Sequence, residues 1–165
     1  SLQFTTLFDS PLGPLALHHD GKSINSLDYL ESPALPVTQP LRPAWHFGLM
    51  DYFAGEFDRL NDLPIHLLKG TAFQQDVWLA LREIPAGQTI SYKTMAQLIG
   101  RPRAIRAVGQ ALRHNPLPII LPCHRVIRGD GSLAGYKWGL ARKRSLIDLE
   151  RRGLFKLANR ALVDD

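Results

Sequence analysis

The apolar pattern of this chain changes near residue 70, and this change limits the possible folds more than any other feature. Before it, alternating segments at Phe4 to Phe8, Leu15 to His18 and Ile24 to Tyr29 are separated by turn residues at 11–14 and 20–21. After it, most apolar residues recur at helical spacing. The pattern predicts a small β-meander followed by a mainly helical region.

One helix and one loop are also expected in the first region. Trp45, Leu49 and Tyr52 have helical spacing, and this helix should end near Gly55. The stretch Ser32 to Pro43 contains four prolines, which is typical of a loop.

The second region contains a candidate helix-turn-helix. A capping-box pattern at Thr71 to Gln74 begins its first helix, and Pro85-Ala86-Gly87 ends it. A second helix is predicted over Tyr92 to Ile99. Pro102 is expected to occupy the first position of a third helix. Two short helices joined by a Gly-Arg-Pro turn fit a helix-turn-helix.

Two faces are distinguishable on the third helix. The predicted core face consists of Ile105, Val108 and Leu112. A separate polar and basic stripe consists of Arg103, Arg106, Gln110 and Arg113. Small residues that permit a close approach to another surface are Ala104, Ala107 and Gly109. A basic stripe is more often solvated surface, but in a helix-turn-helix it favours nucleic-acid binding.

The distribution of charge supports that interpretation. Residues 1–70 carry four Lys/Arg and eight Asp/Glu, whereas residues 71–165 carry sixteen and seven, within a net charge of +5. A basic half beside an acidic half indicates a polyanion-binding face in the basic half. No apolar run is long enough to predict a membrane span, and the N-terminus lacks the pattern of a secretory signal. We therefore expect a cytoplasmic protein without a membrane partner.

Cys123 is the only cysteine of the chain, so it has no internal disulfide partner. It follows an apolar run within Pro122-Cys123-His124-Arg125-Val126. On an extended segment His124 would face away from the thiol and act on it through a bridging water. Glu150, on a helix predicted over Gly139 to Arg152, would orient the imidazole. Two alternatives stay open: an inert buried thiol, and a surface ion pair of Glu150 with Arg151 or Lys143.

Several segments of the second half together resemble one known protein family. The segment Asn115 to Val126 resembles the signature of the O6-alkylguanine-DNA alkyltransferases, also called methylated-DNA–protein-cysteine methyltransferases. Further matches are Phe73 to Trp78, Ile90 to Tyr92, Arg106 to Gly109, Gly131 to Tyr136 and Arg142 to Glu150. The second half is most similar to the C-terminal half of the bacterial adaptive-response protein.

The resemblance implies a role for each matching residue. Cys123 would accept the alkyl group, and His124 and Glu150 would complete a Cys–water–His–Glu relay. Asn115 would brace the cysteine loop, and Tyr92 would donate a hydrogen bond toward guanine N3. The implied substrate-binding residues are Tyr92, Val126 through its carbonyl, Tyr136, Lys137 and Trp138. The implied DNA-binding residues are Arg106, which would enter the base stack, with Arg103, Ala107, Gly109 and Arg113.

Lys137 and Trp138 replace small residues that many family members carry. We hypothesise that Trp138 narrows the pocket, so that a methyl group is accepted better than a benzyl group. The zinc-binding cysteines of some animal members are absent, and we expect neither a metal nor a cofactor.

The expected fold is α/β (α+β) with two small domains. Residues 1–69 would form a ribonuclease-H-like sheet domain that carries little chemistry. Residues 70–153 would form a winged helix-turn-helix domain that holds the site, followed by a C-terminal tail over 154–165.

The expected function is direct, single-use repair of DNA in a prokaryotic cytoplasm. A methyl group would pass irreversibly from O6 of guanine, and from O4 of thymine, to Cys123 after the base is flipped from the minor groove of double-stranded DNA. We expect a monomer and leave cooperative binding to DNA open. The alternatives are a binding-only relative, in which the cysteine is replaced, and a winged-helix transcription regulator.

Overall fold

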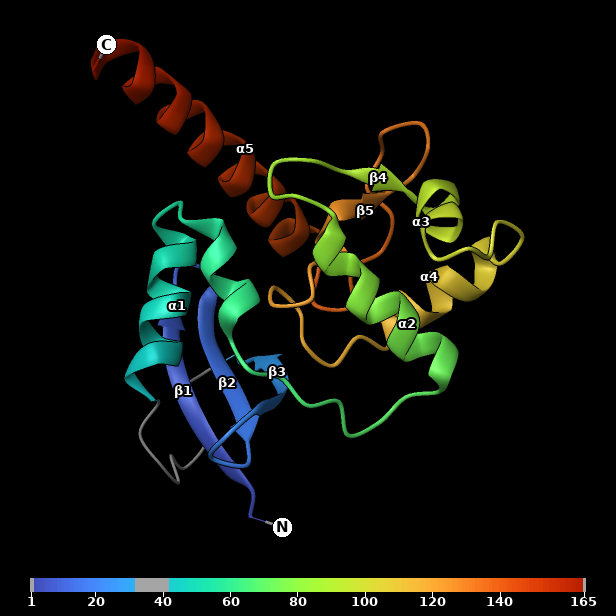
Figure 1. Cartoon of the computed structure of the whole chain (residues 1–165), viewed down its shortest axis with the longest axis horizontal. Helices are drawn as coiled ribbons and strands as arrows, with labels where there is room; N and C mark the ends of the chain where they lie inside the picture. The colour runs from blue at the N-terminus through green and yellow to red at the C-terminus, as the bar shows by residue number, and fades with distance from the viewer. Residues whose placement is uncertain (1, 32–41, 165) are drawn as a thin grey trace.

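A three-stranded antiparallel sheet forms one side of the molecule, and a helix packs beside it (Figure 1). The computed structural model describes residues 2–31 and 42–164, with side chains described up to Gly153. The strands, in sheet order, are β1 (Phe4–Ser10), β2 (Gly13–His19) and β3 (Ile24–Tyr29). The helix is α1 (Pro43–Phe53). The predicted meander and helix are confirmed, whereas most of the loop predicted over Ser32 to Pro43 lies outside the described residues.

The packing of this half follows from its apolar pattern. Leu15 and Leu17 are fully buried on β2, where Leu15 lies opposite Tyr29 of β3. On α1, Trp45 and Leu49 are buried, and the Trp45 ring meets the edge of the His19 ring at a centroid distance of 4.9 Å. The apolar face of α1 therefore covers the sheet.

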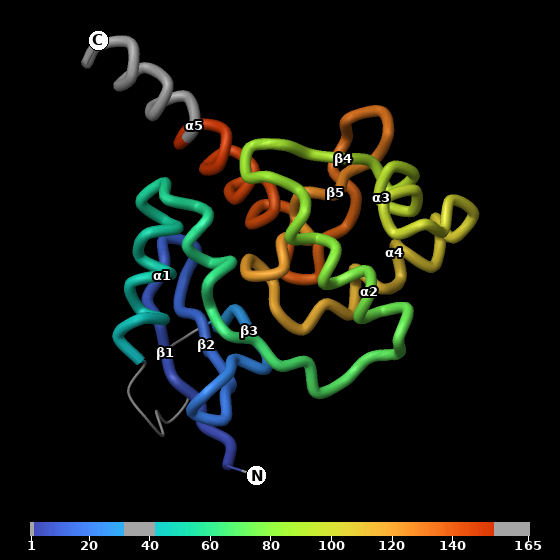
Figure 2. Tube along the Cα trace, viewed as in Figure 1, coloured from blue at the N-terminus to red at the C-terminus, as the bar shows by residue number. Residues whose placement is uncertain are grey.

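The chain crosses to the second half after the short 3₁₀ helix η1 (Phe57–Asp62) (Figure 2). On the way, Ile65 pairs in parallel with Ile24. The amide of Leu27 on β3 donates to the carbonyl of Pro116, 2.9 Å away, and joins the sheet to the second half. The buried apolar residues of both halves form one continuous cluster. The division at residue 69 stays a prediction.

The second half consists of short helices and two very short strands. Its elements are α2 (Ala72–Ala80), η2 (Leu81–Glu83), β4 (Ile90–Ser91), α3 (Tyr92–Leu98), α4 (Ile105–Arg113), η3 (Cys123–Arg125), β5 (Val126–Ile127) and α5 (Leu140–Asp164). The strands β4 and β5 pair in parallel, and α3 and α4 form the predicted helix-turn-helix. The mixed α/β class is therefore confirmed. Among the described helices, none has the length and apolar character needed to span a membrane.

The start of α4 differs from the prediction. Pro102 lies in a turn in which the amide of Ala104 donates to the carbonyl of Arg101, and α4 begins only at Ile105. Pro102 therefore occupies the second turn position, where its fixed φ is favoured. Arg103 lies in the same turn rather than on the helix.

Two further expectations about helices are wrong. Ile105 is 41% exposed at the first position of α4, so it is not a core residue, and Ala111 is buried beside Val108 and Leu112 instead. The predicted end of the last helix at Arg152 is also wrong, because α5 continues to Asp164.

The capping box at the start of α2 is confirmed. The Thr71 hydroxyl accepts from the amide of Gln74 at 3.1 Å, and the Gln74 side chain accepts from the amide of Thr71 at 3.0 Å. Both bonds satisfy helix amides that otherwise have no partner.

We expect Thr71→Ala to lower the free energy of unfolding by about 1 kcal/mol, because the alanine leaves the Gln74 amide without its acceptor. Urea unfolding followed by circular dichroism measures this change. Thr71→Ser is the matched control, since it keeps the oxygen and should retain most of the stability. Equal losses in both variants would contradict the role of the cap.

Candidate active site

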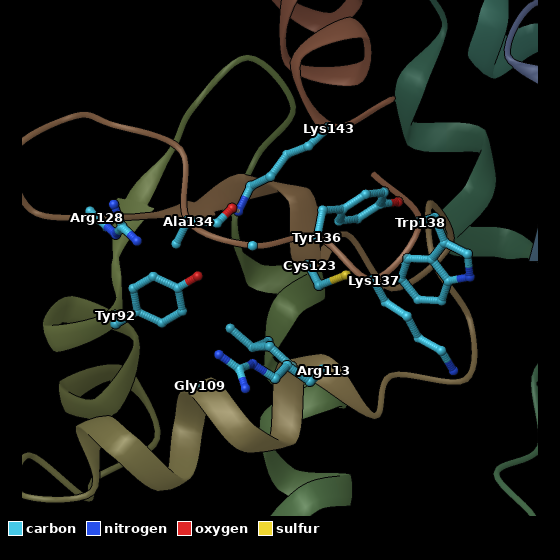
Figure 3. A pocket seen from close by; sticks show the side chains of 12 residues that line it. Tyr92, Gly109, Arg113, Cys123, Arg128, Ala134, Tyr136, Lys137, Trp138 and Lys143 are labelled. Atoms are coloured by element: carbon cyan, nitrogen blue, oxygen red, sulfur yellow. Dashed lines mark hydrogen bonds between the residues drawn. The ribbon is translucent and has the colours of Figure 1, made fainter. Parts of the chain in front are cut away.

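A cavity of about 290 Å³ opens beside Cys123, between the helix-turn-helix and the irregular segment that precedes α5 (Figure 3). This volume is close to the lower end of the range for ligand pockets, about 300–1,000 Å³. The sequence-predicted residues that line it are Tyr92, Gly109, Arg113, Cys123, Tyr136, Lys137 and Trp138. The cavity is therefore large enough for a small ligand.

The loop before Cys123 is held in an unusual conformation. The side-chain nitrogen Nδ2 of Asn115 donates to the carbonyl of Leu121 at 2.8 Å, and its side-chain oxygen Oδ1 accepts from the backbone amide of Leu117 at 3.0 Å. Ile119 has a φ of 74°, a left-handed conformation that is costly for a β-branched residue. Cys123 then begins the 3₁₀ turn η3, so the expectation of an extended segment at Cys123 and His124 is wrong.

The thiol of Cys123 is almost completely buried, with 5% of the residue exposed. Burial raises the pKa of Cys123 to about 11, while a hydrogen bond from the Asn115 side chain and the positive charge of Lys143 act in the opposite direction. The sulfur therefore lies at the cavity where burial disfavours the thiolate and Asn115 and Lys143 favour it.

The carboxylate of Glu150, on α5, organises the buried side of the site. One oxygen accepts from the Tyr52 hydroxyl at 2.6 Å and from His124 Nε2 at 2.7 Å. Arg125 donates to both oxygens, through Nε at 2.8 Å and Nη2 at 3.0 Å. Burial alone would raise the pKa of Glu150, but His124 and Arg125 hold it well below its usual value. The alternative of a surface ion pair is wrong, because Glu150 is 1% exposed.

His124 is suited to act as a base. It is fully buried, and burial lowers its pKa despite the opposing effect of Glu150, so the imidazole is neutral at pH 7. With Glu150 ionised, Nε2 carries the hydrogen and Nδ1 is left with a lone pair. Among the described residues, Nδ1 has no hydrogen-bond partner. A proton released by Cys123 therefore has an acceptor on the neighbouring residue.

Lys143 is a site residue that the sequence analysis did not identify as such. It is 1% exposed, and its Nζ donates to the carbonyls of Val126 at 2.8 Å and Ala134 at 3.2 Å. Burial lowers the pKa of Lys143 to about 8, while the thiolate form of Cys123 raises it. The Val126 carbonyl, which the resemblance assigns to the exocyclic amine of guanine, therefore has one of its two lone pairs engaged.

The predicted DNA-binding residues lie on or just before α4. Arg103, Arg106 and Ala107 are exposed, and Arg113 is exposed at the rim of the cavity. A Cβ added at Gly109 would lie 4.0 Å from the Tyr92 ring, which is ordinary contact. Packing within the protein therefore does not demand glycine there, and close approach of DNA at Gly109 stays a prediction.

Tyr92 begins α3 on the side of the cavity across from Tyr136 and Trp138 (Figure 3). Burial raises the pKa of Tyr92, and the nearby Cys123 thiolate raises it further. Its hydroxyl is therefore protonated at neutral pH and available as a hydrogen-bond donor.

The first half of the chain contributes more to the site than predicted. Tyr52 of α1 bonds Glu150, and the hydroxyl of Tyr29 of β3 lies 3.2 Å from that of Tyr136. Residues 1–69 therefore contribute supporting contacts to the site, and the expectation that they carry little chemistry stays a prediction. Tyr52 is separated from Glu150 by 98 residues, and no local sequence pattern indicates such a contact.

Comparisons with known proteins agree with the geometry. The DNA-binding domain of 6-O-methylguanine DNA methyltransferase matches residues 72–152. A methylated-DNA–protein-cysteine methyltransferase of Mycobacterium tuberculosis H37Rv is 46% identical over 154 residues, covering 87% of this chain and 89% of the relative. The bifunctional transcriptional activator/DNA repair enzyme Ada of Escherichia coli K12 is 55% identical over 93 residues, covering 54% of this chain and 26% of Ada. A crystal structure of Mycobacterium tuberculosis OGT in complex with DNA superposes with a TM-score of 0.78 at 44% identity, covering 90% of this chain and 93% of that one.

Lys143→Met should shift the lower part of the pH profile of Cys123 alkylation, below about pH 8 where Lys143 is charged, to higher pH by about 1 unit or more, because it removes a positive charge that stabilises the thiolate. The rate of alkylation by iodoacetamide, followed by intact mass across a pH series, measures this shift. Lys137→Met is the matched control, since Lys137 lines the same cavity but is exposed. Superimposable profiles for the two folded variants would refute the electrostatic role of Lys143.

Proposed function

Because the chain belongs to the methylated-DNA–protein-cysteine methyltransferases, we propose that it repairs DNA by transferring a methyl group from O6 of guanine to its own Cys123. The observation that carries this assignment is the position of the thiol. Cys123 lies in a cavity of about 290 Å³, next to a neutral His124 that is bonded to an ionised Glu150. A nucleophile, a proton acceptor and an orienting carboxylate are thereby assembled beside a cavity that a flipped nucleobase can enter.

Access to the substrate requires that the guanine leave the duplex. The buried thiol cannot reach O6 of a base that is paired and stacked in the duplex, so the nucleotide is flipped into the cavity at a cost of a few kcal/mol. Arg106 is exposed on α4 and fills the vacated space in the stack, which offsets part of this cost. The small residues Ala107 and Gly109 let α4 lie deep in the minor groove. Contacts with phosphates supply most of the affinity, so binding weakens with salt and depends little on sequence.

The proposed transfer is an in-line displacement. His124 Nδ1 takes the thiol proton through a bridging water, and Lys143 stabilises the thiolate that results. The thiolate attacks the methyl carbon, so that a sulfur–carbon bond forms while the carbon–O6 bond breaks. The electron pair of the broken bond moves to O6 and the purine ring. Tyr92 donates a hydrogen bond from its hydroxyl toward N3, which stabilises this charge until N1 of the guanine takes up a proton from water, and His124 releases the proton of the thiol to water.

The product limits each molecule to one repair event. A thioether is uncharged and a poor electrophile, so the methyl group stays on Cys123 and the protein is consumed. Each step uses side chains of this chain and needs no cofactor. O4 of thymine presents the same kind of alkylated oxygen, and we include O4-methylthymine as a second substrate.

Two other functions fit the helix-turn-helix but not the site. A protein that binds alkylated bases without repairing them, or a transcription regulator, has no use for a thiol beside a His124–Glu150 pair. We propose that the protein acts as a monomer on double-stranded DNA in a prokaryotic cytoplasm. The bacterial relatives and the single reduced thiol support this setting.

Incubation with a duplex containing O6-methylguanine should increase the intact mass of the protein by one methylene group. The increase should reach one equivalent and stop, and peptide mapping should locate it at Cys123. Cys123→Ala should bind the same duplex without gaining mass. A wild-type protein that binds the duplex and keeps its original mass would contradict the proposed transfer.

Trp138 lines the cavity, so the hypothesis that its ring narrows the space beside the thiol gives a separate prediction. Trp138→Gly should raise the rate of benzyl transfer from O6-benzylguanine by about tenfold or more relative to methyl transfer. The size follows because one added or missing group in an apolar pocket changes relative rates by about 10- to 200-fold. Leu140→Ala, at an exposed position two residues further on that does not line the cavity, is the control and should leave this ratio unchanged. Equal inactivation of the wild type by methylated and benzylated guanine would refute the hypothesis.

A further inference from the structure

The cavity wall opposite Tyr92 has little regular structure of its own. It belongs to residues 128–139, here called the wall loop, which joins β5 to α5 and carries Tyr136 and Trp138. Backbone hydrogen bonds between residues of this loop lie near its two ends, at Arg128 to Ser132 and at Tyr136 to Gly139. The positions of the two wall side chains therefore depend on contacts with other parts of the molecule.

Tyr29 of β3 provides such contacts to both wall side chains. Its hydroxyl lies 3.2 Å from the hydroxyl of Tyr136, within hydrogen-bond distance. Its ring meets the Tyr136 ring edge-on at a centroid distance of 6.4 Å and the Trp138 ring at 6.0 Å. Tyr136 and Trp138 also contact each other at 5.0 Å. The three rings form one aromatic cluster with Tyr29 on the side away from solvent.

Tyr29 is more deeply buried than Tyr136 and Trp138, and it belongs to a paired strand. It is 9% exposed, whereas Tyr136 and Trp138 are each partly exposed. It lies opposite Leu15 in the β2–β3 ladder, and the next amide, of Leu30, donates to the carbonyl of Pro14 at 2.9 Å.

Arg142 of α5 connects Tyr29 to the backbone of the wall loop. Its guanidinium carbon lies 4.6 Å from the centroid of the Tyr29 ring, a cation–π distance. Its Nη1 donates to the carbonyl of Trp138 at 3.2 Å. Trp138 is therefore restrained through its ring by Tyr29 and through its carbonyl by Arg142.

We infer that Tyr29 is a positioning residue that holds Tyr136 and Trp138 against the cavity, and that the N-terminal sheet thereby sets how bulky an O6 adduct the protein accepts. The inference rests on the proposed alkyl transfer to Cys123 and adds a residue outside residues 70–153 to its specificity. With the cluster intact, the Trp138 ring stays in the wall of the cavity that holds Cys123 and favours methyl over larger groups. Without Tyr29, the wall loop retreats more easily and a benzyl group finds room.

The size of the effect follows from the contacts that are lost. A neutral hydrogen bond, or one aromatic pair, biases an equilibrium of this kind by about two- to tenfold. Tyr29→Phe removes the hydroxyl but keeps the ring over Arg142, whereas Tyr29→Leu removes both. The ratio of benzyl to methyl transfer rates should rise by about threefold in Tyr29→Phe and by about tenfold or more in Tyr29→Leu.

The experiment measures both transfer rates by intact mass, with duplexes containing O6-methylguanine or O6-benzylguanine. Phe8→Leu is the matched control, because Phe8 is a buried aromatic residue of β1 that stacks on Phe53 rather than on the wall loop. A general loosening of the sheet changes the ratio equally in Phe8→Leu and Tyr29→Leu. The inference is overturned if both Tyr29 variants keep the ratio within twofold of wild type or change it no more than Phe8→Leu does.

A double variant separates positioning from a general loss of stability. In the Trp138→Gly background one of the two rings that Tyr29 holds is gone, so Tyr29→Leu should change the ratio by a smaller factor than it does in the wild type. An undiminished effect in that background would overturn the inference. Failure of the proposed function gives a different result. The intact mass of the wild type and of every Tyr29 variant would then stay unchanged with either duplex.

Discussion

The buried carboxylate of Glu150 is the interaction on which the rest of the site depends. A carboxylate that is 1% exposed is stable only if its charge is paired and its lone pairs are bonded. Tyr52 from α1, with His124 and Arg125 from η3, meets this requirement. Because Arg125 neutralises the carboxylate, His124 can remain uncharged beside it. One residue of α5 therefore fixes the cysteine turn, docks the N-terminal helix and keeps the imidazole available as a base.

Features encoded by neighbouring residues were predictable from the sequence. The capping box at Thr71 and the extents of β3 and α3 followed from local hydrogen-bonding capacity and apolar spacing. The segment around Cys123 indicated its chemistry because a thiol without a disulfide partner, placed next to a histidine, is suited to act as a nucleophile. The predicted start of the third helix at Pro102 was wrong for a local reason as well, since proline is favoured at the first position of a helix and at the second position of a turn alike.

The residues that the sequence did not reveal act over long separations in the chain. Tyr29 is 107 residues from Tyr136, and Arg125 reaches Glu150 across 25 residues. Lys143 resembled any lysine on an amphipathic helix, although its ammonium group is buried against two carbonyls. Nothing in the periodicity of a helix or strand separates such a residue from a solvated one. Only the folded arrangement shows which polar side chains have been withdrawn from water and therefore need specific partners.

Burial of Cys123 has two opposite consequences for the proposed reaction. It disfavours the thiolate, and Asn115 and Lys143 oppose this effect. It does not disfavour the thioether, which carries no charge and fits an apolar surrounding. The same desolvation that raises the pKa of the thiol therefore favours the methylated product over the reactive anion. An exposed cysteine would ionise more easily but would lose this bias and react with other electrophiles. A protein that uses its nucleophile once can therefore function with a site in which ionisation of the thiol is unfavourable and the methylated product is stable.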